Sequence, residues 1–238
     1  MKTLTYSLSY YNQGKEAIMK HINIWKEYPK EVKDKISFYL MDDCSKEPLN
    51  KILIDEDFQN LDIHIYRVEV DLYCNIPGVM NLSARECKAE WIIMLDMDTL
   101  VSSGTARKFL ELIDKDEKKT VYKFNRDLRN VPHMLKKNPS GFKIHPKVCM
   151  IRVKDFWDTG GYEEDLVGNY GMTDPVFFYR AKGKLKIVFC HDIFLIYYSE
   201  GESDIKRDVK KNTKLFEKRK RDGKWSTDYV RFPWKKVF

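Results

Sequence analysis

The sequence predicts an α/β fold in which a mostly parallel sheet is flanked by helices and followed by a basic helical extension at the C-terminus. Three observations support this prediction. Short apolar runs alternate with segments of helical period over the first hundred residues. The run Trp91–Leu95 is apolar throughout, as in strands buried on both faces of a parallel sheet. Hydrophobic residues make up 43% and charged residues 33% of the 238 residues, a balance typical of globular proteins.

The first half of the chain has the predicted order β-α-β-α-β-α-β. We expect strands at Leu4–Leu8, Ile36–Met41, Ile63–Val68 and Trp91–Leu95, and helices at Gly14–Tyr28, Leu49–Phe58 and Met80–Ala89. In the first helix Ile18, Ile22 and Trp25 recur at i, i+4 and i+7, which places them on one helical face. Pro48 precedes the second helix, where a first turn tolerates proline. Strands that alternate with helices are joined by right-handed crossovers, which favours parallel pairing.

The second half of the chain is less regular. We expect strands at Thr120–Phe124 and Lys186–Phe189, a turn at Gly160-Gly161, and a basic helix over Asp204–Arg221. The length fits one large domain or two small ones.

Several classes of protein are excluded by composition. No window approaches the ~18–20 apolar residues that cross a bilayer, and the N-terminus lacks a secretory apolar region, so a cytoplasmic location is expected. The five cysteines are odd in number and never occur as Cys-x-x-Cys, which argues against a disulfide framework or a zinc site. We interpret them as reduced residues of the core.

The basic charge is concentrated in the C-terminal tail. Residues 203–238 hold 13 of the 43 Lys and Arg but only 5 of the 36 Asp and Glu, so the rest of the chain carries about −1 of the net +7. This tail fits contact with phosphates or with an anionic membrane surface, and it fits equally well a solvated helix packed on the body. The aromatic residues after it either return to the domain or line an acceptor groove.

Polar residues follow three of the predicted strands. They are Ser9-Tyr10-Tyr11-Asn12, Asp42-Asp43-Cys44-Ser45 and Asp96-Met97-Asp98. Ligands of parallel α/β sheets gather beyond the carboxyl ends of the strands, so these residues are expected to converge. Asp96 and Asp98 point to one side if the segment is extended, and two such carboxylates suit Mg²⁺ or Mn²⁺ shared with substrate phosphates. The alternative is a solvated turn.

Six short motifs follow one another between residues 3 and 198. They are Tyr11-Asn12, Met41-Asp42-Asp43-Cys44-Ser45, Gly78 with Asn81, the segment Ala89–Asp98, Gly160-Gly161-Tyr162-Glu163-Glu164, and Tyr170-Gly171-Met172-Thr173-Asp174 with Arg180. In this order the chain resembles the nucleotide-sugar glycosyltransferases of family two, which have the GT-A fold. Each motif alone is weak, and six in order are specific.

The resemblance implies a GT-A-like, Rossmann-type sheet and a division of the chain into three parts. Residues 1–100 form the nucleotide-sugar-binding half, residues 101–200 the acceptor-binding half of the same domain, and residues 201–238 a basic and aromatic extension. It also implies a metal-dependent, inverting transfer, with Mn²⁺ or Mg²⁺ as cofactor. The sugar moves from a nucleoside-diphosphate donor of the UDP, GDP or dTDP type to a carbohydrate or glycoconjugate acceptor.

The resemblance also assigns roles to residues of the nucleotide-binding half. Asp43 binds the nucleobase and Tyr11 lies against the face of the base, Asp96 lies near the ribose and the metal, and Asp98 ligates the metal. The remaining nucleotide-sugar-binding residues are Ser9, Asn12 and Asn81. The alternatives are that Tyr11 only covers the sheet edge and that Asp43 belongs to a turn.

The resemblance makes Asp174 the catalytic base, because it keeps the family's interval of six residues before Arg180. A base must take the proton of the attacking acceptor hydroxyl, and a carboxylate is a usual solution. The alternative is that Asp174 caps the helix that begins near Pro175.

The chain departs from the family at several positions. Met80 stands where an arginine is expected, and Arg85, one helical turn later, is a candidate substitute for a phosphate contact. The family's histidine falls at Tyr197 or Tyr198, so His191 is either a metal ligand from a shifted register or a structural histidine.

Two other classes of function compete with this prediction. A nucleic-acid or phosphate-binding module would use the basic tail, but it leaves the three polar strand ends unexplained, and we expect no nucleic acid as partner. A nucleotidyltransferase would usually carry a glycine-rich basic loop after the first strand, and residues 9–15 are not such a loop.

Overall fold

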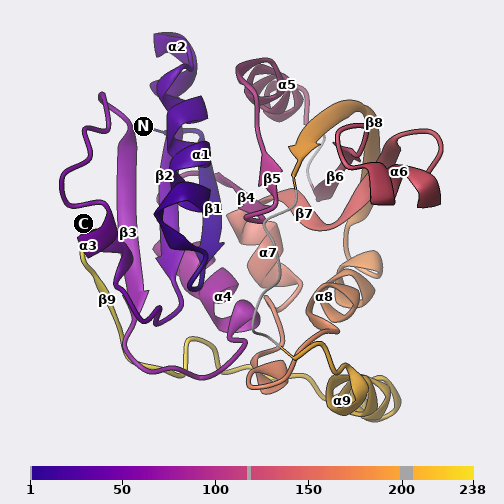
Figure 1. The fold of residues 1–238 in the computed structure, drawn as a ribbon. Helices are drawn as coiled ribbons and strands as arrows, with labels where there is room; N and C mark the ends of the chain where they lie inside the picture. Colours follow the sequence, from indigo (N-terminus) through magenta and orange to yellow (C-terminus); the bar gives the residue numbers. More distant parts are fainter. Residues whose placement is uncertain (1, 117–118, 199–205) are drawn as a thin grey trace.

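The computed structural model describes residues 2–116, 119–198 and 206–238. These residues form an α/β domain around one nine-stranded sheet with the strand order β5-β8-β6-β7-β4-β1-β2-β3-β9 (Figure 1). The strands are β1 (Leu4–Tyr10), β2 (Ile36–Asp42), β3 (Asp62–Val68), β4 (Trp91–Leu95), β5 (Thr99–Leu100), β6 (Thr120–Asp127), β7 (Phe142–Arg152), β8 (Lys186–Tyr197) and β9 (Trp234–Lys236).

Helices cover both faces of the sheet. They are α1 (Gly14–Lys26), α2 (Lys30–Lys33), α3 (Leu49–Ile52), α4 (Ile76–Glu86), α5 (Ser103–Asp114), α6 (Pro132–Lys137), α7 (Val153–Asp158), the 3₁₀ turn η1 (Glu164–Leu166), α8 (Thr173–Lys182) and α9 (Lys210–Asp222). None of the helices in the described ranges is both long and apolar enough to span a membrane.

The N-terminal half confirms the predicted parallel sheet. Strands β4, β1, β2 and β3 pair in parallel in that order. Their residues alternate between two cores: Trp91, Ile93 and Leu95 face the core under α1 and α5, while Ile92 and Met94 face the core under α4, α7 and α8. Because both faces are covered by helices, β2 and β4 are buried along their whole length, which explains the unbroken apolar run of β4.

The second half adds antiparallel pairings that the sequence did not predict. Strand β7 runs antiparallel to both β4 and β6, and β5 runs antiparallel to β8. Strand β7 therefore continues the sheet of the first half into the second. The predicted division at residues 100 and 200 stays a prediction. Strands from both sides of residue 100 belong to the same sheet.

Several predicted elements change in length. The helix expected over residues 49–58 ends at Ile52, and the one expected from Met80 begins at Ile76 with a proline in its first turn. The strand expected to end at Phe189 continues to Tyr197.

The C-terminal extension packs on the domain. Helix α9 begins at Lys210, later than predicted, and residues 204 and 205 of the predicted helix lie outside the described residues. After α9 the chain crosses to the far edge of the sheet, where β9 pairs antiparallel with β3 (Figure 1). Val230 and Phe232 are 9% and 8% exposed and join the core under α4. The aromatic end therefore returns to the domain, whereas membrane contact through the extension stays a prediction.

Candidate active site

The carboxyl ends of the parallel strands meet at one edge of the sheet. Tyr10 at the end of β1 is in register with Asp42 at the end of β2, and Leu8 is in register with Leu95 at the end of β4. The segment that follows β4 carries Asp96 and Asp98. The polar segments after β1, β2 and β4 thus converge, as the sequence predicts.

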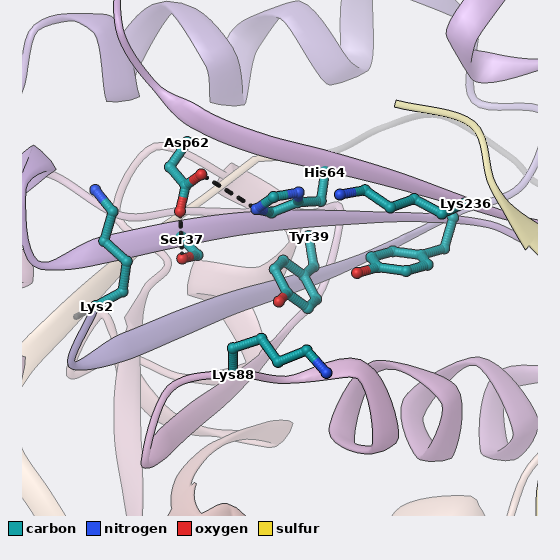
Figure 2. A pocket seen from close by; sticks show the side chains of 8 residues that line it. Lys2, Ser37, Tyr39, Asp62, His64, Lys88 and Lys236 are labelled. Carbon is teal, nitrogen blue, oxygen red and sulfur yellow. Dashed lines mark hydrogen bonds and ion pairs between the residues drawn. The ribbon is translucent and has the colours of Figure 1, made fainter.

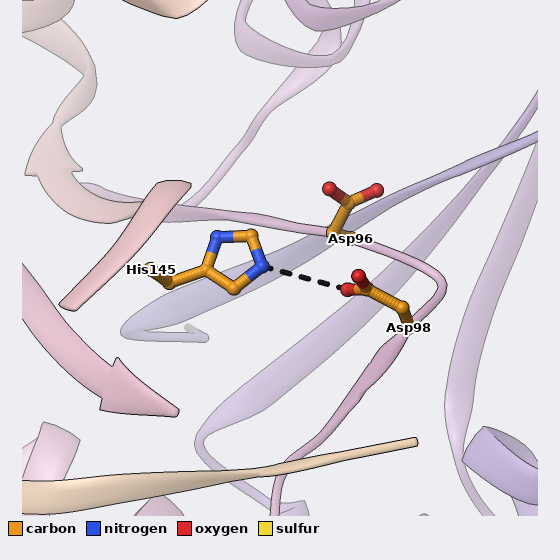
Figure 3. A group of neighbouring side chains, drawn as sticks. All are labelled: Asp96, Asp98 and His145. Carbon is orange, nitrogen blue, oxygen red and sulfur yellow. Dashed lines mark hydrogen bonds and ion pairs between the residues drawn. The ribbon is translucent and has the colours of Figure 1, made fainter. Parts of the chain in front are cut away.

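An acidic pair and a histidine form the centre of this edge. One ligand atom each of Asp96, Asp98 and His145 lies within 4.8 Å of the others (Figure 3). His145 is 1% exposed, and its Nε2 lies 3.4 Å from Oδ1 of Asp98. Carboxylate oxygens are the ligands that Mg²⁺ and Mn²⁺ prefer, so the pair of aspartates fits a hard divalent cation.

A bulge in β7 brings His145 to this position. The pairing of β6 with β7 jumps from Lys123↔Cys149 to Asn125↔Ile144, so residues 145–148 leave the regular ladder. The freed backbone N–H groups of Lys147 and Val148 donate to Nδ1 of His145 over 3.1 and 3.0 Å.

These two hydrogen bonds fix the tautomer of His145. Because Nδ1 accepts, the proton of the neutral imidazole sits on Nε2, the nitrogen that faces Asp98. Nε2 therefore donates to the carboxylate and has no free lone pair for a metal. His145 orients Asp98, and the two carboxylates are the protein ligands that fit a cation here.

Lys147 lies on the same bulge and is 5% exposed. Its Nζ donates to Oγ of Ser9 over 3.1 Å and lies 3.3 Å from Oδ1 of Asp96, so the ammonium bridges the ends of β1 and β4. Burial is the largest influence on the pKa of Asp96 and would raise it, but the neighbouring groups, foremost the charge of Lys147, together outweigh burial and hold that pKa below its usual value.

Asp174 lies in the first turn of α8, beside this cluster. The nearby charges that act on its carboxylate include those of Lys147, Asp96 and Lys123. Burial raises its pKa, and its Oδ1 is buried without a hydrogen-bond partner in the structure. The alternative that Asp174 caps the helix is wrong: the N-cap position belongs to Met172, with φ of 65°, and no side-chain cap bond is made.

Lys123 of β6 is a second buried cation in this neighbourhood. Its side chain lies over the ring of Phe178, with Nζ 3.9 Å from the ring centre, and donates to the carbonyl of Pro146. Burial lowers its pKa to about 8, and the charge of Asp174 opposes that shift.

Asp43 and Asp42 differ in their use of hydrogen bonds. Asp42 is occupied within the protein, since it accepts from the backbone of Ser45 and Leu49 and pairs with Arg67. Within residues 2–116, 119–198 and 206–238, Asp43 accepts only from the backbone N–H of Asn75 through Oδ2, over 3.2 Å, and its buried Oδ1 has no partner. Burial raises the pKa of Asp43 to about 7.

Tyr11 and Asn12 line the loop after β1. The Tyr11 hydroxyl donates to Oδ2 of Asp71 over 3.1 Å. The side-chain oxygen of Asn12 accepts from the backbone N–H of Lys46, and the backbone N–H of Asn12 donates to the hydroxyl of Ser45. These bonds connect this loop to the one after β2. The structure thus places the loop of Tyr11 and Asn12 next to the loop that carries Asp43, while their contacts with a nucleotide stay predictions.

Asn81 lies deeper in the protein than the other predicted site residues. It is fully buried on α4, and its two amide protons go to the carbonyl of Tyr162 and to Oε1 of Glu164 over 2.9 and 2.8 Å. Its Oδ1 accepts from the N–H of Tyr162. Asn81 therefore holds the segment 161–164 against α4.

The structure answers the questions raised by the departures from the family. His191 is exposed on β8 beside Phe189 and does not join the acidic pair. Met80 is fully buried in the core, and the guanidinium of Arg85 lies 6.0 Å from the ring centre of Trp234 in β9. The residues that sequence reasoning missed are His145, Lys147 and Lys123, for which no local motif exists.

A cavity of about 180 Å³ lies elsewhere on the sheet (Figure 2). It is lined by Lys2, Ser37, Tyr39, Asp62, His64, Tyr66, Lys88 and Lys236. Ser37 and Asp62 stand at the amino-terminal parts of β2 and β3, opposite to the edge that carries the acidic pair. Asp62 accepts from Ser37 over 2.6 Å and pairs with His64 over 3.1 Å, so these three side chains are already engaged with one another.

Comparison with known proteins agrees with this geometry. Residues 30–182, more than half of the chain, match the family model described as Glycosyl transferase family 2. The chain belongs to this family. The comparison with curated proteins found no match.

Several solved structures are similar in fold to this glycosyl transferase family 2 chain. S. aureus TarS 1-349 in complex with UDP-GlcNAc is 17% identical with a TM-score of 0.61, over 85% of this chain and 60% of that chain. Mannosyltransferase PcManGT from Pyrobaculum calidifontis, in complex with GDP-Man and Mn²⁺, is 17% identical with a TM-score of 0.63, over 94% and 65%. GalNAc-T7 with UDP, GalNAc and Mn²⁺ is 14% identical with a TM-score of 0.63, over 84% and 44%. The chain thus spans less than two thirds of each, and the likeness confirms the GT-A-like fold.

Proposed function

We propose that the chain is a glycosyltransferase that moves a sugar from a nucleoside-diphosphate donor to a glycan or glycoconjugate acceptor. One observation carries the proposal: the buried Asp43 and the half-buried Asp174 at this edge each have one buried oxygen with no hydrogen-bond partner among the residues that the structure describes. A buried acceptor without a donor is costly, and at the ligand-binding edge of a parallel sheet a bound ligand would supply the missing donor. The carboxyl edge of the sheet would hold the nucleobase of the donor near Asp43 and the acceptor near Asp174.

The donor nucleotide would lie along the loops after β1 and β2. The unpartnered Oδ1 of Asp43 would accept from an N–H of the nucleobase, with the ring of Tyr11 against the face of the base. Ser9 and Asn12 would line the same loop, and Asn81 would contribute through the segment that it holds. Asp96 would lie near the ribose.

A divalent cation, Mn²⁺ or Mg²⁺, fits the carboxylates of Asp96 and Asp98. Structures of PcManGT and GalNAc-T7 contain Mn²⁺, which supports a divalent ion in a related fold. When bound, such an ion neutralises charge on the diphosphate leaving group. His145 holds Asp98 in orientation, and Lys147 supplies a further fixed positive charge at the same edge.

Asp174 would act as the general base of an inverting transfer. Its Oδ1 is buried beside the acidic pair, and a raised pKa makes it a better proton acceptor than an exposed aspartate. It would take the proton of the acceptor hydroxyl as that oxygen attacks the anomeric carbon from the face opposite the leaving diphosphate. A single displacement of this kind forms no covalent sugar–enzyme intermediate.

Thermal-shift measurements with UDP, GDP, dTDP and CDP sugars, each with Mn²⁺ and with EDTA, test the proposal. A shift for one nucleotide that is larger with Mn²⁺ supports a metal-assisted glycosyltransferase. The matched control is Asp114→Asn, an exposed aspartate on α5, which should leave the shift unchanged. A shift with an oligonucleotide and with none of the sugars would contradict the proposal and favour nucleic-acid binding.

A further inference from the structure

The resemblance implies an arginine at position 80 as a phosphate contact, and this chain has Met80 there. Met80 occupies that position and is fully buried in the core. Arg85 lies against Trp234 of the edge strand β9 and does not join the acidic pair. A diphosphate that binds at the ends of β1 and β4 therefore needs a positive group from another element.

Lys147 is placed to supply that group. Its ammonium stands between Oγ of Ser9 and Oδ1 of Asp96, at the carboxyl ends of the two central parallel strands. The side chain is 6% exposed, so in this position the ammonium is shielded from bulk water. It enters from β7, a strand that belongs to neither predicted nucleotide-binding loop.

The charges at this edge explain why Lys147 rests on Asp96. Three carboxylates, those of Asp96, Asp98 and Asp174, gather around the two ammonium groups of Lys147 and Lys123. A divalent cation on the acidic pair would replace Lys147 as the countercharge of Asp96. The freed ammonium would then have lost its closest carboxylate and would keep the hydroxyl of Ser9 and the charge of Asp174. A buried charge that has lost an ion pair is stabilised by an anion that arrives with the metal.

We propose that Lys147 is the residue that binds the diphosphate of the donor, and that it passes from Asp96 to the phosphates when metal and donor bind together. The proposal rests on the proposed function. It makes metal binding and diphosphate binding mutually dependent. The metal would take the place of Lys147 as the countercharge of Asp96, and the diphosphate would supply an anion for the ammonium of Lys147. It also makes Lys147 the functional replacement for the arginine that is expected at position 80.

This exchange predicts opposite effects on the two ligands. Lys147→Met removes the competitor of the metal, so Mn²⁺ alone should bind the variant as tightly as wild type or more tightly. The same variant should bind the nucleoside diphosphate at least about tenfold more weakly, the effect of losing a charged hydrogen bond. The parent nucleoside, which has no phosphate, should bind both proteins equally. A residue that only supported the fold would weaken all three ligands together.

Calorimetry of Mn²⁺ alone, of the nucleoside, and of the nucleoside diphosphate with Mn²⁺ measures these effects. Lys143→Met, an exposed lysine on the same strand, is the matched control. Lys147→Arg should restore diphosphate binding, and Lys147→Gln, which keeps hydrogen-bonding atoms near Ser9 and Asp96, should not. Thermal melts of each variant show that it is folded.

Two results would overturn the inference. One is a folded Lys147→Met and Lys147→Gln pair that binds the diphosphate within twofold of wild type. The other is a parallel loss of Mn²⁺, nucleoside and diphosphate binding, which would assign Lys147 to the fold. A wild-type protein that binds no nucleoside diphosphate at all would contradict the proposed function itself and is thereby told apart from both.

Discussion

Nε2 of His145 faces Oδ1 of Asp98 at 3.4 Å, while Nδ1 of the same ring accepts two backbone N–H groups. The ring is therefore a donor to the carboxylate, although its position beside two aspartates resembles that of a metal ligand (Figure 3). The distinction depends on the bulge in β7, because a regular ladder would have used the N–H groups of residues 147 and 148 elsewhere.

The role of His145 predicts a specific spectroscopic result. Pulsed electron paramagnetic resonance of the Mn²⁺ complex should show no coupling to the nitrogen of a directly bound imidazole. His145→Gln, whose amide can also donate to Asp98, should keep Mn²⁺ affinity closer to wild type than His145→Ala. Loss of a group that orients a ligand typically weakens metal binding by about 10–100-fold. A strong nitrogen coupling in wild type that disappears in His145→Gln would show that the ring is a ligand.

The buried carboxyl of Asp43 predicts a pH-dependent affinity for the nucleotide. Burial raises its pKa to about 7, so in the free protein the group is mostly protonated below that pH and ionised above it. The ionised form is the stronger acceptor for a nucleobase N–H, so affinity should rise between about pH 6 and pH 8. Asp43→Asn should flatten this rise, and Asp43→Ala should cost about 1–3 kcal/mol of binding at pH 8. Calorimetry that finds the same pH profile in wild type and Asp43→Asn would remove Asp43 from the site.

The same group predicts a pH-dependent stability. The pKa of Asp43 is higher in the folded protein than the value of 3.8 for an unperturbed aspartate, so between these two values the folded state binds more protons than the unfolded state. Its contribution to the free energy of unfolding is therefore present at low pH and is lost as pH rises toward 7. Urea unfolding at pH 5 and pH 8 should show Asp43→Asn gaining stability relative to wild type at pH 8. A relative gain at pH 5 instead would reverse the sign and contradict this account.

Asp174 predicts both a rate and a stereochemical outcome. Asp174→Asn keeps the shape of the side chain but cannot take a proton, so kcat should fall by about 10²–10⁴-fold while donor affinity stays within about twofold. Asp192→Asn, an exposed aspartate on β8, is the control. Proton NMR of the product made from an α-linked donor should show a β-linkage. Retention of the α-linkage would refute the single displacement and the role of Asp174.

The C-terminal extension is expected to stabilise the fold. Phe232 is 8% exposed in the core under α4, and the buried side chains of Glu163 and Glu164 accept backbone hydrogen bonds from Ser226 and Val230. Phe232→Ala should cost about 3–5 kcal/mol in the free energy of unfolding. Phe238→Ala, at 55% exposure, should cost less than about 1 kcal/mol by the same urea titration. Equal effects of the two changes would show that the extension is only loosely attached.

The parallel half of the fold could be predicted because its signals are local. The strand Trp91–Leu95 was predicted with the bounds that the structure has, since five apolar residues in a row are needed where both faces of a sheet are covered. Strand β7 was missed because its sequence, with Pro146 and two lysines, has no strand pattern. Its pairing with β4 and β6 is a long-range property, and the bulge within it interrupts the alternation of buried and exposed residues.

The candidate site shows the same difference between local and long-range signals. Asp43, Asp96 and Asp98 follow predicted strands, so their convergence was predictable from topology alone. His145 and Lys147 reach the same edge only because β7 returns antiparallel to β4, which nothing near them in the sequence indicates. His191, which the sequence leaves open as a metal ligand or a structural histidine, is exposed on β8.

The central claim is that Asp96 and Asp98 hold a cation that binds the diphosphate of a sugar nucleotide. Calorimetry of the preferred nucleoside diphosphate with wild type, Asp98→Asn and the control Asp114→Asn, each with Mn²⁺ and with EDTA, tests it most directly. The side chain of Asp98 is 27% exposed, so removing its charge should leave the fold intact. We predict that Mn²⁺ strengthens binding to wild type and to the control, and that this gain disappears in Asp98→Asn. An equal gain from Mn²⁺ in all three proteins would contradict the claim.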